Sequence, residues 1–179
     1  MNRLRGSRVY LAGAIDRSPD NGVTWRHEIT PLLREIGIVS INPCDKPIIG
    51  NNETPEFAAE NRFWQKAGEF DKIIERRQTR NEDLRLIDVC AEFLIVNLNM
   101  DHRPFGTIEE IVMANSQKKP ILVWMHGGIK ECPIWLLWML GSVETIFSSR
   151  DELLQYIRDI DSGRKNNKRF IFLDHSKLI

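Results

Sequence analysis

The sequence predicts a doubly wound α/β fold, in which helices cover both faces of a five-stranded parallel sheet. Apolar runs of strand length recur along the chain, as at 93–98. Segments with apolar residues at helical spacing lie between these runs, as at 153–160. Strands that alternate with helices form βαβ units, whose parallel strands are buried on both faces. A chain of 179 residues has the size of one ordinary domain, so we expect a single domain over 1–179.

The composition excludes several functional classes. The 25 basic and 25 acidic residues cancel, so no net charge attracts the chain to a nucleic acid polymer or to a membrane surface. No apolar run approaches the roughly 18 residues that a membrane-spanning helix needs, and the apolar stretch near the N-terminus is too short for a signal peptide. The three cysteines, Cys44, Cys90 and Cys132, form neither a disulfide framework nor a CxxC metal pair. We therefore expect a cytoplasmic protein.

The first βα unit covers residues 8–37. Residues 8–15 predict a central strand that ends in small residues, which let a ligand approach the backbone. Turn-forming residues over 16–22 predict a loop. Helical spacing over 25–36 predicts a helix with Gly37 as its C-cap. Pro31 leaves two alternatives, either a helix kinked at this residue or a regular helix that starts at Pro31 behind an N-capping threonine.

The next segment predicts a strand over 38–43 and a polar loop to about residue 52. Apolar residues at helical spacing then predict one long helix over 55–77; they are Phe63, Ala67, Phe70 and Ile74. The charged run 75–80 is either a solvated helix end or a basic clamp for a phosphate. A further helix follows, with Leu84, Ile87 and Ala91 on one face, and it leads into a strand over 93–98.

Residues 106–118 predict a helix that opens with two adjacent carboxylates. Gly106 suits a sharp turn out of the preceding strand, and Thr107 suits the N-cap. The stretch from Thr107 to Glu110 also fits a capping box, which is a structural role. Alternatively, Glu109 or Glu110 points into a crevice at the carboxyl end of the strand, where ligands bind in open α/β sheets.

The C-terminal part completes the alternation. It predicts strands over 120–125 and 145–148 with a very apolar short helix over 133–140 between them. An amphipathic helix follows over 153–160. The tail 169–176 predicts an extended segment that pairs at a sheet edge or packs on a neighbouring subunit.

The architecture that fits these elements is flavodoxin-like, with strand order 2-1-3-4-5 and right-handed crossovers. Its switch point lies between the first and third strands, so the loops that follow residues 14 and 98 meet there. This arrangement places Tyr10, Asp16 and the segment 106–110 around one crevice.

The crevice points to carboxylate chemistry. The four histidines show no ligand spacing, and the sequence has no P-loop, no GxGxxG fingerprint and no GxSxG elbow. We therefore expect neither a metal site, nor covalent serine or cysteine catalysis, nor dinucleotide binding. Glu109 or Glu110 remains, with four possible carboxylate partners: Asp16, Asp83, Asp88 and Asp101.

Three elements resemble the nucleoside 2-deoxyribosyltransferase superfamily, to which nucleotide N-glycosidases are related. They are Val9-Tyr10-Leu11-Ala12-Gly13, Asp83-Leu84 ahead of the strand at 91–96, and Gly106-Thr107-x-x-Glu110-x-x-x-Ala114. The match spans roughly residues 8–125 and, more weakly, 133–141. It implies the flavodoxin-like fold and cleavage of the N-glycosidic bond of a 2′-deoxynucleoside or nucleotide. It also implies a homo-oligomer and no metal or organic cofactor, because a carboxylate carries the covalent step.

Carried over by position, the resemblance makes Glu110 the nucleophile and Tyr10 the hydroxyl group that orients it. It makes Asp83 the residue that contacts the base and helps to deliver a proton. A carboxylate suits this chemistry because it stabilises the oxocarbenium character of C1′ and traps it as an ester. The predicted substrate-binding residues are Gly13, Asp16, Arg17, Asp101 and Gly106.

Three functions remain open at this stage. The favoured one is a deoxyribosyltransferase that exchanges bases through Glu110. The second is a nucleoside 5′-monophosphate N-glycosidase, in which Arg17 and Arg26 bind the phosphate. The third is a non-catalytic nucleotide-binding module, motivated by two departures from the family pattern. Pro104 stands where relatives often carry an aspartate, and Trp135 stands near an expected asparagine.

Overall fold

The computed structural model describes residues 2–48 and 52–172 and contains one sheet of five parallel strands. The spatial order is β2-β1-β3-β4-β5. The strands are β1 (Arg8–Gly13), β2 (Val39–Ile41), β3 (Phe93–Leu98), β4 (Ile121–Met125) and β5 (Ile146–Phe147). The structure thus confirms the predicted doubly wound, flavodoxin-like fold and its strand order.

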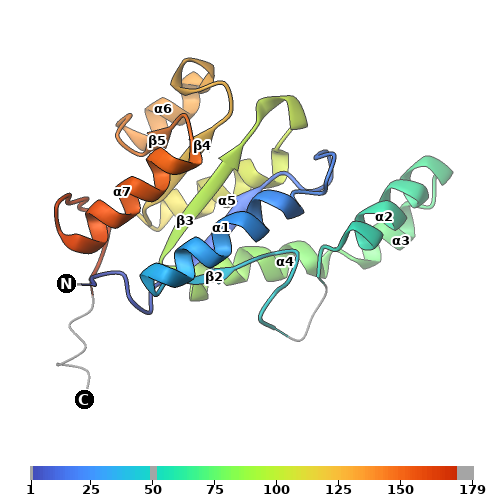
Figure 1. Cartoon of the computed structure of the whole chain (residues 1–179). Coiled ribbons are helices and arrows are strands. Elements are labelled where there is room, and N and C mark those ends of the chain that lie inside the picture. The colour runs from blue at the N-terminus through green and yellow to red at the C-terminus, as the bar shows by residue number, and fades with distance from the viewer. Residues whose placement is uncertain (1, 49–51, 173–179) are drawn as a thin grey trace.

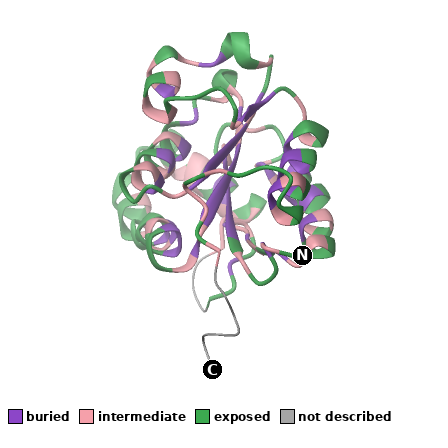
Figure 2. Ribbon diagram, turned by 90° about the vertical axis from the view of Figure 1, so that its left-hand side faces the viewer, coloured by how far each residue is buried: buried purple, intermediate pink, exposed green. Residues whose placement is uncertain are grey.

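Helices cover both faces of the sheet (Figure 1). On one face, α1 (Val23–Ile36) and α7 (Arg150–Ser162) pack against inward side chains such as Val9 and Leu11. On the other face, α5 (Phe105–Ser116) and α6 (Ile134–Leu140) pack with a π-helical turn, Leu86–Cys90, against side chains such as Tyr10. The strands therefore form the buried centre between two helical layers (Figure 2).

Helix α1 runs through Pro31 without interruption, so the helix that was expected to start there is the wrong alternative. The hydroxyl group of Thr30 donates a hydrogen bond to the carbonyl of Arg26 at 2.7 Å, so Thr30 lies within the helix and not at its N-cap. The helix ends at Gly37, whose positive φ of 89° and backbone N–H bonds confirm the predicted C-cap.

The predicted long helix over 55–77 is wrong. Two helices occur instead, α2 (Pro55–Ala67) and α3 (Phe70–Glu75), and they fold back on each other beside the sheet (Figure 1). Gly68 breaks the helix, because its φ of 74° is the left-handed conformation that ends helices. The break turns three apolar side chains outward; Phe63, Phe70 and Ile74 are 64%, 58% and 56% exposed.

Helix α5 begins earlier than predicted, so the proposed capping box is wrong. Pro104 occupies the N-cap position, and no side chain caps the helix. Thr107 lies buried inside the helix, and Gly106 lies in its first turn. A Cβ atom at Gly106 would meet no atom within 4 Å, so the chain does not need glycine there. The turn is made instead by Arg103, which has a positive φ of 49°.

The remaining elements match the sequence closely. The helix before β3 consists of α4 (Gln78–Arg85) and the π-helical turn, and α6 ends at Gly141 in the left-handed conformation. The described part of the tail forms no strand, and Phe170 packs against Phe93 of the same chain at 5.3 Å between ring centroids. The rest of the predicted extended tail, including His175, lies outside the described residues. No helix in the described ranges is long and apolar enough to cross a membrane.

Candidate active site

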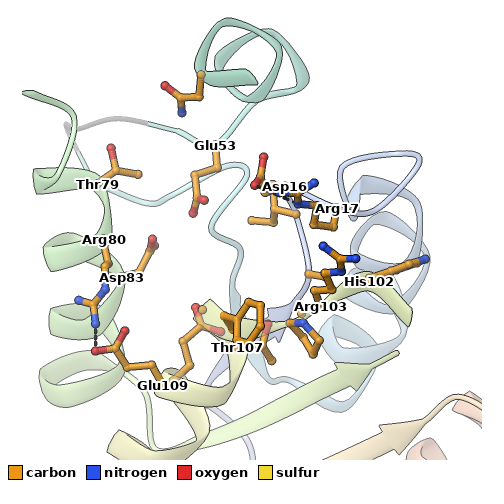
Figure 3. A pocket seen from close by; sticks show the side chains of 18 of the residues that line it. Asp16, Arg17, Glu53, Thr79, Arg80, Asp83, His102, Arg103, Thr107 and Glu109 are labelled. Carbon is orange, nitrogen blue, oxygen red and sulfur yellow. Dashed lines mark ion pairs between the residues drawn. The ribbon is translucent and has the colours of Figure 1, made fainter. Parts of the chain in front are cut away.

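A cavity of about 460 Å³ opens at the carboxyl end of the sheet, between the loops that follow β1 and β3 (Figure 3). Asp16 enters it from the first of these loops, Asp83 from α4, and Glu110 from α5. This is the switch-point position that the strand order predicts. Its volume lies within the usual range of small-molecule sites, about 300–1,000 Å³.

Glu110 is held by Tyr10. Tyr10 is fully buried in β1, and its hydroxyl group donates a hydrogen bond to Glu110 Oε1 at 3.0 Å. Burial and, after it, the negative charge of Asp83 raise the pKa of Glu110 to about 8, against the opposing effect of the Tyr10 hydrogen bond. The cavity therefore contains a carboxyl group, that of Glu110, which loses its proton only at neutral to alkaline pH.

Glu109 lies in a different environment. Its side chain is half-exposed and forms an ion pair with Arg80 of α4 (Figure 3). An exposed, screened ion pair leaves a carboxylate in an ordinary aqueous setting. Of the two adjacent glutamates, only Glu110 combines burial with a positioned hydroxyl group.

Asp83 belongs to a buried charge cluster. Lys46 Nζ lies 2.9 Å from Asp83 Oδ1 and 3.9 Å from Glu53 Oε1, and the Lys46 side chain is completely buried. Burial raises the pKa of Glu53 well above its usual value, and the charge and hydrogen bond of Asp83 act in the same direction. Burial, followed by the charge of Glu110, also raises the pKa of Tyr10.

The structure separates the predicted binding residues into two groups. Gly13, Asp16, Arg17 and Gly106 line the cavity together with Glu110. Among the described residues that line the cavity, neither Asp101 nor Asp88 occurs, so the role of Asp101 in substrate binding stays a prediction without support from the cavity. The carboxylate of Asp88 instead accepts a hydrogen bond from Gln117.

The absence of a side chain at Gly13 has a structural cause. A Cβ atom at Gly13 would lie 3.1 Å from both Asn97 O and Trp25 Cζ2, closer than ordinary contact, so β3 and α1 leave little room for a side chain. Asp16 lies 3.8 Å from Arg62 and 3.9 Å from Arg17, and all three side chains are partly exposed.

Arg26 does not face the cavity, which corrects its predicted role as a phosphate ligand. Its guanidinium group is fully buried and donates hydrogen bonds to the carbonyls of Leu11, Gly13 and Gly22 at 2.8–3.0 Å. It also stacks over Trp25, with 4.7 Å to the ring centroid. The donors of Arg26 are therefore used to fix the end of β1 and the loop behind it.

Several residues at the site were missed by the sequence analysis. Lys46 and Glu53 lie in the loop that follows β2, and His102 and Arg103 lie in the loop that follows β3. All of these loops end at the same edge of the sheet, which is the one signal that points to them. In the described ranges, no group of three or more His, Cys, Asp and Glu side chains is arranged to hold a metal ion.

A scan of known protein families finds no match for the sequence, and a search of curated proteins finds none either. A search of solved structures finds a 2-desoxiribosyltransferase from Leishmania mexicana, with a TM-score of 0.55 and 18% sequence identity. The alignment covers 85% of this chain and 97% of that chain. The two proteins share a fold. The shared fold extends over nearly the whole length of the transferase.

Proposed function

We propose that the protein cleaves the N-glycosidic bond of a 2′-deoxynucleoside and transfers the deoxyribosyl group to another base. The observation that carries the proposal is the partly buried Glu110 carboxyl group, which lines a cavity of about 460 Å³ and accepts a hydrogen bond of 3.0 Å from Tyr10. The fold shared with a 2-desoxiribosyltransferase supports it. We further propose a single domain and a homo-oligomer; the 64% and 81% exposure of Ile134 and Trp138 on α6 supports a subunit contact.

The proposed reaction has two halves. In the first, a Glu110 carboxylate oxygen forms a bond to C1′ while the C1′–N bond breaks and its electron pair stays on the base. An acid in the cavity protonates the departing base. In the second, a nitrogen atom of another base attacks C1′, and Glu110 leaves as the carboxylate. The two inversions give net retention at C1′.

Chromatography of the protein with a deoxynucleoside and a different free base tests this function. A new deoxynucleoside that forms only in the presence of the acceptor base is the expected result. Base released at the same rate without an acceptor would make the protein a hydrolase. Tight binding without turnover for every base would favour the non-catalytic module.

One observation favours a second candidate, a nucleoside 5′-monophosphate N-glycosidase. Arg17, His102 and Arg103 approach one wall of the cavity, opposite Asp83 and Arg80 (Figure 3). Among the described residues, the guanidinium group of Arg103 has no hydrogen-bond or ion-pair partner. Arg103 also holds a left-handed backbone conformation, which non-glycine residues rarely adopt. A guanidinium group so placed suits a phosphate.

We expect Arg103→Gln to raise KM for 2′-deoxycytidine 5′-monophosphate about 10-fold or more and to leave KM for deoxycytidine unchanged. The reason is that a hydrogen bond to a charged group contributes about 1.5–3 kcal/mol. Steady-state kinetics with both substrates measures it, and Arg77→Gln, at another arginine that lines the cavity, is the matched control. A loss confined to Arg77→Gln would place the phosphate at the charged run 75–80 instead.

A further inference from the structure

Glu53 occupies a position from which an acid can reach a departing base. It lies directly before α2, and its side chain points into the cavity toward Asp83 (Figure 3). It also lines an adjoining cavity of about 200 Å³. Glu53 therefore lies between the larger cavity, which Glu110 also lines, and the smaller cavity, which residues of α2 line.

The neighbouring charges distinguish the roles of the two carboxyl groups. The ammonium group of Lys46 lies 2.9 Å from Asp83 and 3.9 Å from Glu53, so Asp83 is its nearer partner. A lysine that is completely buried needs a carboxylate as its counter-ion, because an unpaired buried charge is very costly. Asp83 fills this need as the nearer counter-ion, at 2.9 Å from the Lys46 ammonium group.

Glu53 is the group that keeps a proton. Burial, the negative charges of Asp83 and Glu110, and a hydrogen bond shared with Asp83 all raise the pKa of Glu53, and only Lys46 opposes them. A carboxylic acid that is protonated at neutral pH and faces a cavity fits the requirements of a general acid.

We propose that Glu53, rather than Asp83, is the acid that protonates the departing base, and that the Lys46–Asp83 ion pair positions it. This inference rests on the proposed function. As the C1′–N bond breaks, the Glu53 O–H proton passes to the base nitrogen that receives the electron pair, and Glu53 becomes a carboxylate. Lys46, 3.9 Å away, stabilises that charge. When another base attacks C1′, its N–H proton returns to Glu53, so protons and charge balance over the cycle.

Two substrates test the inference. Deoxyadenosine needs protonation of its base, whereas the base of 7-methyl-2′-deoxyguanosine already carries a positive charge and leaves without a proton. We expect Glu53→Gln to lower kcat for deoxyadenosine about 100-fold or more, because general acid catalysis contributes about 10²–10⁴-fold. We expect kcat for 7-methyl-2′-deoxyguanosine to change far less. Retained turnover of the second substrate also shows that the variant is folded.

Asp83→Asn is the matched control. Without Asp83, Lys46 pairs with Glu53 and lowers its pKa, and the pKa of Glu110 also loses the upward effect of the Asp83 charge. The pH of maximum activity on deoxyadenosine should therefore move to lower values than in the wild type. Glu53→Gln should not regain this activity at any pH. Activity of Glu53→Gln on deoxyadenosine equal to wild type, or an equal loss on both substrates, would overturn the role of Glu53. If the wild type turned over neither substrate, the proposed function itself would be rejected, and this inference with it.

Discussion

Replacement of Glu110 by glutamine should lower glycosidic cleavage about 10³-fold or more while the protein remains folded. Glutamine keeps the shape of the side chain and accepts the hydrogen bond from Tyr10, which is 3.0 Å long in the wild type. It cannot form a glycosyl ester that is displaced in turn, so the covalent route is lost. Losses of this size are expected when a nucleophile is removed from an enzyme. Initial rates of base release and base exchange measure the effect.

The adjacent glutamate provides the control for this prediction. Glu109→Gln makes the same chemical change one residue earlier, but it breaks only a half-exposed ion pair with Arg80. Such pairs contribute little, so the variant should keep most of the activity. An inactive Glu109→Gln together with an active Glu110→Gln would reverse the assignment and make Glu109, which also lines the cavity, the nucleophile.

The pH dependence of the same reaction gives an independent check. Because the pKa of Glu110 is raised to about 8, the fraction of Glu110 in the carboxylate form, the proposed nucleophile, increases as the pH rises toward that value. The rate should then fall at still higher pH, where Glu53, the proposed acid, loses its proton. We therefore expect kcat/KM for deoxyadenosine to be bell-shaped, with its maximum on the alkaline side of neutrality.

The place of the site was predictable because it depends on topology alone. Once apolar runs define the strands and their order, the loops after β1 and β3 must meet at the switch point. The rule brings Tyr10 and the pair Glu109 and Glu110 to this point, since Tyr10 lies on a central strand and the pair lies in the helix that starts beside it. The choice of Glu110 over Glu109 came from the resemblance to the deoxyribosyltransferase superfamily. The rule requires no knowledge of side-chain contacts.

The buried charge cluster was not predictable by the same route. Lys46 and Glu53 come from the loop after β2, and Asp83 comes from α4, 30 or more residues away along the chain. In the sequence each is one of 25 basic or 25 acidic residues, most of which are expected on the surface. The packing of α4 against the loop after β2 brings the three side chains together and buries Lys46 and Asp83, and the resulting desolvation raises the pKa of the partly exposed Glu53.

The wrong element boundaries have a local cause. Apolar spacing continues across Gly68 in the sequence, but the backbone leaves the helix there in a left-handed conformation. At α5, Gly106 and Thr107 looked like a turn and a cap, whereas Arg103 makes the turn and the helix starts two residues before Thr107. Glycine and threonine permit these roles without requiring them, and the surrounding packing decides.

The Glu110 carboxyl group, the proposed nucleophile, should also weaken the fold in alkaline solution. Glu110 has a pKa of about 8 in the folded protein and a usual value of 4.5. The folded state therefore binds its proton more tightly than the unfolded chain does. The stability that this proton contributes is fully present below the usual pKa and is lost as the pH rises through about 8.

Glu110→Gln should remove this pH dependence, because an amide has no proton to lose. At pH 5 the variant and the wild type should have similar free energies of unfolding. At pH 9 the variant should be more stable by about 2–5 kcal/mol, since each pKa unit corresponds to about 1.4 kcal/mol. Urea denaturation at both pH values measures this difference, and Glu109→Gln should show no such gain. If the difference between Glu110→Gln and wild type were the same at pH 5 and pH 9, the Glu110 carboxyl group would not be desolvated. A gain in stability together with a loss of activity would show that burial of Glu110 is maintained for function at the expense of the fold.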